Sequence, residues 1–200
     1  MTAIWTGLGL AAAAGWNAWA VLLVFNGLYL LLPQDFPGGV AGFLASPTVL
    51  QIAAVLFLAE FVVTKIPRID RFWEAAHTVL RPIVGALLAL ASVGELSLAA
   101  RAGIALLAGV VTLAVHAAKS ATRLTSTAAT RGWTQFALSI AEDVIAVMLA
   151  ILFFFQPWLT TIFLAALVAA LLMHWPRVAR GLQILFFRIQ HPRRRTEDGT

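Results

Sequence analysis

Apolar segments of about 20 residues follow one another along most of this chain, and that is the length an α-helix needs to cross a membrane. Six such segments can be marked, at about residues 7–32, 48–66, 72–94, 98–118, 134–155 and 158–175. Hydrophobic residues make up 61% of the 200 residues and charged residues only 12%, too few to cover a soluble domain. The sequence therefore predicts an all-α membrane protein with six transmembrane helices.

Basic residues gather in three places along the chain. They are the connection after the second segment, the connection after the fourth, and the tail after residue 176: Lys65, Arg68 and Arg71; Lys119, Arg123 and Arg131; and the arginines from Arg177 to Arg195. Cytoplasmic loops of membrane proteins carry such an excess of lysine and arginine. With six crossings, all three lie on one side, so we predict an inner-membrane protein with both termini cytoplasmic. Their position at helix ends argues against nucleic acid as a partner, despite the net charge of +5.

The predicted domains are a transmembrane domain over residues 1–176 and a cytoplasmic basic tail over 177–200. The start of the chain lacks the basic region of a signal peptide, so we expect the first span to be retained. In the tail, apolar residues flanked by arginines predict an amphipathic helix lying on the anionic membrane surface. A continuation of the sixth span into the cytosol is an equally good interpretation.

Two short stretches of the chain are similar to each other. Residues 56–63 and 138–145 both contain a glutamate, Glu60 or Glu142, after an apolar run and an alanine. We interpret them as parts of a duplication, with one repeat at about 7–96 and the other at about 97–176. Three spans in each repeat would make the second inverted in the membrane, an arrangement typical of transporters with a site at the repeat interface.

Polar and ionisable residues lie within five of the six segments. A charged side chain at the centre of a bilayer costs about 2.5–3.5 kcal/mol on insertion scales, so each needs a partner or water. Asn17 follows Gly15 in an alanine-rich stretch, which allows close helix packing or a local break of the first helix. We predict a transport or ion-binding site from the following residues: Asn17, Glu60, Lys65, His77, Arg81, His116, Lys119, Arg123, Ser139, Glu142 and Asp143.

Metal and cofactor chemistry have weak support in the sequence. The chain has no cysteine, which excludes thiolate ligands and cysteine nucleophiles. The carboxylates Glu60, Glu142 and Asp143 are the only metal ligands we would name, if there is a metal. His77 and His116 lack a compact spacing such as HExxH, and each is more often a hydrogen-bonded structural histidine. We predict no cofactor.

The order of these residues resembles that of a widespread bacterial family of small integral membrane proteins, labelled only as a domain of unknown function. The resemblance covers roughly residues 10–160 and rests on four motifs: Glu60-x4-Lys65-Ile-Pro67, His77-x3-Arg81-Pro82, His116-x2-Lys119-x3-Arg123 and Ser139-x2-Glu142-Asp143. Thr64 departs from the family, which usually has an acid before the lysine, and this removes one possible cation ligand. The family label implies no activity.

Three functions fit these features. The first is a small transporter or channel for ions or a small solute, in which the carboxylates bind a cation or a proton. The second is a structural or scaffold membrane protein whose buried ion pairs only fix helix packing. The third, an enzyme acting on lipid with His77 or His116 as base, ranks last because no nucleophile motif is present, so we predict no enzyme. The predicted partners are the lipid bilayer and the ion or small solute. A homodimer is a further predicted partner, because a second copy would help so thin a bundle to enclose a pathway.

Overall fold

The structure is a computed structural model that describes residues 2–37, 39–63, 67–126, 133–170 and 172–173. Every regular element within these ranges is a helix and none is a strand, which confirms the all-α prediction. The predicted amphipathic helix of the tail lies outside the described residues.

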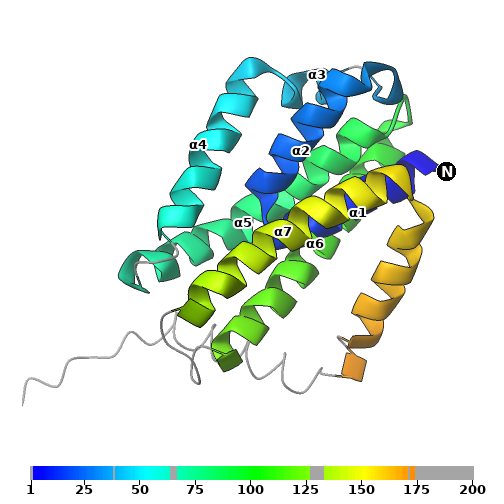
Figure 1. Ribbon diagram of the computed structural model, residues 1–200. Helices are drawn as coiled ribbons and strands as arrows, with labels where there is room; N and C mark the ends of the chain where they lie inside the picture. The colour runs from blue at the N-terminus through cyan, green and yellow to red at the C-terminus, as the bar shows by residue number, and fades with distance from the viewer. Residues whose placement is uncertain (1, 38, 64–66, 127–132, 171, 174–200) are drawn as a thin grey trace, which may run out of the picture.

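The helices follow the predicted segments closely, except for the first (Figure 1). They are α1 (Thr2–Trp16), α2 (Ala18–Leu31), the 3-10 turn η1 (Pro33–Asp35), α3 (Val40–Leu44), α4 (Pro47–Val63), α5 (Pro67–Ser92), α6 (Leu98–Ser126), α7 (Trp133–Phe155) and a last described helix, Trp158–Ala170.

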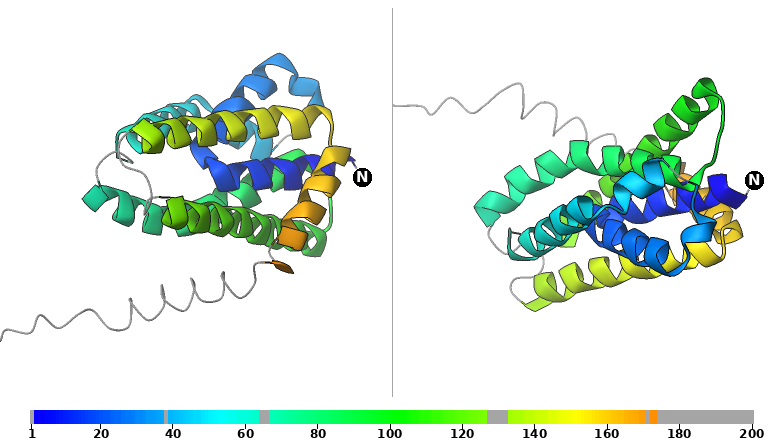
Figure 2. Two further views of the ribbon diagram at one scale, coloured as in Figure 1. Left: turned by 60° about the horizontal axis from the view of Figure 1, so that its bottom comes forward. Right: turned by 90° about the horizontal axis from the view of Figure 1, so that it is seen from above.

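The first apolar segment forms two helices that fold back on each other. Asn17 between them has an extended backbone, with φ −149° and ψ 106°. Thr2, at the start of α1, and Asp35, just after α2, line the same cavity. Figures 1 and 2 show α1 running from the N-terminus into the bundle and α2 returning toward the same end. We call this end the N-terminal end, and the end with the α4–α5 and α6–α7 connections the opposite end.

This hairpin corrects the prediction of one continuous helix over 7–32. The turn cannot be recognised from the composition of the segment, because both helices are apolar and a single asparagine separates them. The first predicted repeat thus contains a hairpin where the second contains the 29-residue α6, and the inverted repeat is not confirmed. The prediction that both termini lie on one side counted residues 7–32 as the first of six crossings, whereas the hairpin leaves Thr2 at the end opposite the α4–α5 connection.

Helix α1 lies at the centre of the bundle and packs against α5, α6 and α7. Its residues from Gly7 to Gly15 are all buried, so no face of this stretch is left for solvent. A helix that is apolar all round must be enclosed, and small residues let its neighbours approach closely. At Gly15 a Cβ atom would lie 2.6 Å from the Cβ of Val115 and 2.8 Å from the carbonyl oxygen of Thr112.

The outer surface of the bundle is strongly apolar. Leu106 and Val110 on α6 are 72% and 55% exposed, and Val55 on α4 and Met148 on α7 are 64% and 62% exposed. Within the described residues, two helices contain apolar stretches long enough to cross a membrane, Ala75–Ser92 and Leu98–Ser120. Exposed apolar surface of this extent indicates that something other than water covers these helices.

We predict that Gly15→Ala lowers the free energy of unfolding by about 1–3 kcal/mol, because the backbone of α6 cannot move away from the added methyl group. Thermal unfolding in detergent measures the change. Gly103→Ala on α6 is the matched control, since nothing lies within 4 Å of its added Cβ. It should be neutral or slightly stabilising, and an equal loss in both variants would contradict the packing argument.

Candidate functional site

The tip of the hairpin lies among the buried charges of the bundle. The last carbonyl groups of α1 have no partner within their own helix, and they carry the negative end of the helix dipole. Lys119 Nζ on α6 donates to the carbonyl oxygen of Trp16 at 2.6 Å, and Arg81 Nη1 on α5 donates to that of Gly15 at 3.4 Å. Two cations from two helices therefore bind the end of α1.

Asn17 connects the hairpin tip to α7. Its Oδ1 atom accepts hydrogen bonds from the backbone N–H groups of Trp19 and Ala20, both at 3.0 Å, which caps the start of α2. Its Nδ2 atom donates to Oδ1 of Asp143 at 2.8 Å. Asn17 thus lies between the two helices, caps the start of α2 and holds the Asp143 carboxylate beside the tip.

The first buried ion pair joins α4 to α5. Arg81 is fully buried, and its Nη2 atom donates to Glu60 Oε1 at 2.7 Å. Glu60 and Ala53 are the buried residues of α4, which stands at the edge of the bundle in Figure 1. The ion pair is therefore a main link between this part of α4 and the core.

The second buried ion pair joins α6 to α7. Lys119 Nζ lies 3.0 Å from Glu142 Oε2, and both side chains are almost entirely buried. Asp143, the next residue, is half-buried and faces the hairpin tip through Asn17. The tip therefore contacts both ion pairs, one between α4 and α5 and the other between α6 and α7.

The partners of His77 determine where its proton lies. Trp19 Nε1, which can only donate, lies 2.7 Å from His77 Nε2, so Nε2 must accept. His77 Nδ1 then carries the hydrogen and donates to the carbonyl oxygen of Trp73 at 2.8 Å. His77 is therefore neutral in this arrangement.

His116 is constrained in the same way by Arg81. The guanidinium group can only donate, and its Nη1 atom lies 2.6 Å from His116 Nδ1. The proton of this neutral imidazole is thus on Nε2, which lies 3.4 Å from Thr78 Oγ1. Arg81 holds a carboxylate and an imidazole at once and organises the α5 side of the site.

The charges of the described cluster do not cancel. Glu60, Glu142 and Asp143 are three carboxylates, and Arg81 and Lys119 are two cations, while both histidines are neutral. Buried charges in proteins are normally paired. Among the described side chains of the cluster, the carboxylates thus outnumber the cations by one.

The structure brings most of the predicted site residues together. They are Asn17, Glu60, His77, Arg81, His116, Lys119, Glu142 and Asp143. Ser139 lies one turn before Asp143, is half-buried and makes no hydrogen bond to the described cluster. Lys65 and the side chain of Arg123 lie outside the described residues.

Two of the three predicted metal ligands take part in separate ion pairs, and the third, Asp143, accepts a hydrogen bond from Asn17. Glu60 pairs with Arg81, and Glu142 pairs with Lys119. Across the part of the chain that the structure describes, no three histidines or carboxylates are grouped closely enough to hold a metal ion.

Three groups of the site were not predicted from the sequence: the carbonyl groups of Gly15 and Trp16, and the indole of Trp19. Backbone acceptors have no sequence signal of their own, and they become visible only when a helix ends. The break at Asn17 was one of two predicted alternatives and is confirmed, but the reversal of direction was not predicted.

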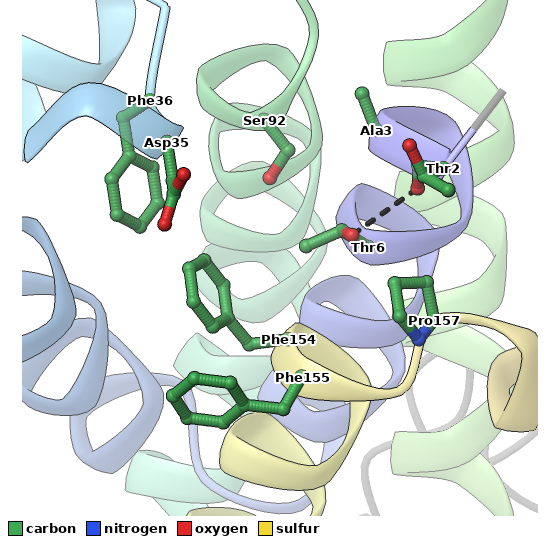
Figure 3. Close-up of a pocket in the computed structure, with 9 residues that line it drawn as sticks. All are labelled: Thr2, Ala3, Thr6, Asp35, Phe36, Ser92, Phe154, Phe155 and Pro157. Atoms are coloured by element: carbon green, nitrogen blue, oxygen red, sulfur yellow. Dashed lines mark hydrogen bonds between the residues drawn. The ribbon is translucent and has the colours of Figure 1, made fainter. Parts of the chain in front are cut away.

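A cavity of about 360 Å³ opens at the N-terminal end, between the start of α1 and the ends of α5 and α7 (Figure 3). Thr2, Asp35, Ser92 and Phe154 are among its lining residues. Along α1, buried apolar residues such as Leu10 occupy the turns between this cavity and the tip. The cavity and the charged cluster are therefore separate.

A family model matches residues 4–177, which include every residue of the described cluster. The chain belongs to the family described as Domain of unknown function (DUF4126). This confirms the predicted family resemblance, and the family description assigns no activity. No curated protein and no solved structure matches the chain.

We predict that Lys119→Met lowers the free energy of unfolding by about 3–5 kcal/mol, because it leaves Glu142 buried without its cation. Adding Glu142→Gln also removes the carboxylate that Lys119 pairs with and should restore at least half of the loss. Denaturant unfolding in detergent measures both variants. Equal unfolding free energies for Lys119→Met and wild type would contradict a buried ion pair.

Proposed function

We propose that this protein is a small multi-pass membrane transporter or channel that moves a proton or a small cation past the tip of the α1–α2 hairpin. The observation that carries the proposal is the charged cluster at that tip, with one carboxylate more than its described cations.

A membrane location is supported by the distribution of polarity. Charged and polar side chains are buried inside the bundle, while large apolar side chains cover its outside. Only 17% of the apolar stretch of α6, Leu98–Ser120, is buried inside the bundle, which suits contact with lipid. In lipid, ionisable side chains face the interior of a bundle and commonly mark ion or substrate pathways.

The hairpin supports transport in particular. Helix α1 has 15 residues and is about 22 Å long, too short to cross a hydrocarbon core of about 30 Å but long enough to pass its middle. Re-entrant segments are tolerated at that depth only where protein or a water-filled cavity surrounds them. Transporters use such helix ends near mid-membrane to bind ions and substrates.

A structural or scaffold protein is the second candidate. The observation in its favour is that each buried ion pair joins two helices, α4 to α5 and α6 to α7. In that case the charges contribute only to stability, and neutralising Asp143 would change no flux. Formation of a homodimer through the apolar exterior is compatible with either function.

The inner-membrane orientation follows from the basic connections. If those between α4 and α5 and between α6 and α7 face the cytosol, the N-terminal end faces away from it. Because the chain has no cysteine, single cysteines report accessibility directly.

We predict that Thr2→Cys and Ser97→Cys react with a membrane-impermeant thiol reagent added to intact spheroplasts, whereas Ser126→Cys reacts only after lysis. A hairpin places residues 2 and 97 on one side. A full first span would instead place Thr2 on the side of Ser126, and that labelling pattern would contradict the hairpin.

We predict that Asp143→Asn lowers cation or proton flux in proteoliposomes by at least about tenfold, the change that 1.4 kcal/mol produces. The assay imposes gradients of sodium, potassium and protons in turn. Glu95→Gln, an exposed acid in the α5–α6 connection, is the control and should leave flux unchanged. Flux no higher than in empty liposomes for the whole panel, or full flux in Asp143→Asn, would refute the proposal.

A further inference from the structure

We propose that the transported or coupling cation is a proton, bound at His77, and that its binding moves the hydrogen bond of His77 Nε2 from Trp19 to Glu60. This inference rests on the proposed function and names the ion and the residue that binds it. Three elements take part: α2 through Trp19, α5 through His77 and α4 through Glu60.

In the observed state, Nε2 of His77 has no proton. The indole N–H of Trp19 points to its lone pair at 2.7 Å, and the other ring nitrogen donates to the carbonyl oxygen of Trp73. The ring of Trp19 meets that of His77 edge-on, at an interplanar angle of 89°. The neutral ring is thus tied to the second residue of α2, next to the hairpin tip.

A second acceptor for Nε2 lies close by. Glu60 Oε2 is 3.9 Å away, beyond hydrogen-bond distance, and this buried atom has no hydrogen-bond partner among the described residues. A buried carboxylate oxygen without a donor is unfavourable. A proton on His77 Nε2 provides that donor once Glu60 or the imidazole moves by about 1 Å, the excess over an ordinary hydrogen bond.

The charge of the cluster favours a proton at this position. A protonated His77 adds one positive charge, which cancels the surplus carboxylate of the described residues. Among the described side chains, the titratable and charged groups of the surrounding elements are Glu60 on α4, Arg81 on α5, His116 and Lys119 on α6, and Glu142 and Asp143 on α7. Three of these six are carboxylates, and Glu60 Oε2 lies 3.9 Å from His77 Nε2.

The other histidine is less suited to accept the proton. His116 Nδ1 already accepts from Arg81, which cannot give up its proton, so protonation there would lose the bond and place two cations together. His77 loses only a hydrogen bond to a neutral indole. It gains one to a carboxylate, and hydrogen bonds to charged groups are the stronger kind.

Proton binding would also change how the helices are connected. The observed bond from Trp19 to His77 links the hairpin to α5, and the new bond from His77 to Glu60 links α5 to α4. Protonation therefore removes the hydrogen bond between the first turn of α2 and α5, and it adds one between α5 and α4. This exchange couples the charge of the site to the position of the hairpin tip.

The test uses the full-length protein in detergent micelles, with ¹⁵N-labelled histidine observed by NMR as the pH is varied. The signals of His77 are assigned as those missing from His77→Gln. We expect Trp19→Phe to raise the ratio of protonated to neutral His77 roughly two- to tenfold at a given pH, since the neutral ring loses its donor. Glu60→Gln should lower the ratio, since the protonated ring loses its carboxylate acceptor.

Trp158→Phe is the matched control, because the indole nitrogen of Trp158 donates to Gln156 Oε1 beyond the end of α7, and neither residue belongs to the charged cluster. It should leave the titration unchanged. If Trp19→Phe does not fold, Glu60→Gln measured against Trp158→Phe decides alone. A His77 that stays neutral down to pH 4, or whose titration is the same in Glu60→Gln and wild type, overturns the proposal.

The NMR titration requires no transport, so the two proposals fail separately. A titration that shifts as expected, without flux in proteoliposomes, supports the proton site and refutes transport. Cation flux combined with a titration insensitive to Glu60 supports transport and refutes His77 as its proton site.

Discussion

The turn at Asn17 is the constraint on which the rest of the arrangement depends. Ending a helix inside an apolar bundle exposes carbonyl and N–H groups that have no water to bind. Here Lys119 and Arg81 bind the carbonyl groups of α1, and the side chain of Asn17 binds the N–H groups of α2. The two cations in turn need carboxylates, which Glu142 and Glu60 provide. The backbone reversal therefore explains why these charges occur in the interior.

The same chain of contacts connects the site to the helices around it. Each ion pair spans two helices, and Asp143 reaches the tip through Asn17, so a change of charge at one position alters the links between elements. Buried ion pairs add little net stability compared with apolar packing, because removing charges from water is costly. Their presence here is more readily explained by the demands of the helix ends and by a role for the charges than by stability alone.

The contact between Trp19 and His77 shows that the tertiary structure defines the tautomer of a histidine, which the residue type alone does not. A histidine in an apolar helix is compatible with a structural role, a ligand or a base. The donor-only indole on one side and the carbonyl oxygen on the other define one neutral tautomer. The unsatisfied oxygen of Glu60 then gives the ring an alternative partner.

The sequence by itself determined the all-helical class, the four helices α4 to α7, and the identity of eight clustered polar residues. It could do so because long apolar segments predict helices, and because polar residues within them need partners inside the protein. Only the tertiary structure decided that the first segment reverses at Asn17, which carboxylate pairs with which cation, and that Trp19 binds His77. Both arms of the hairpin are equally apolar, so hydropathy carries no information on their direction, and pairing depends on how helices distant in sequence pack together.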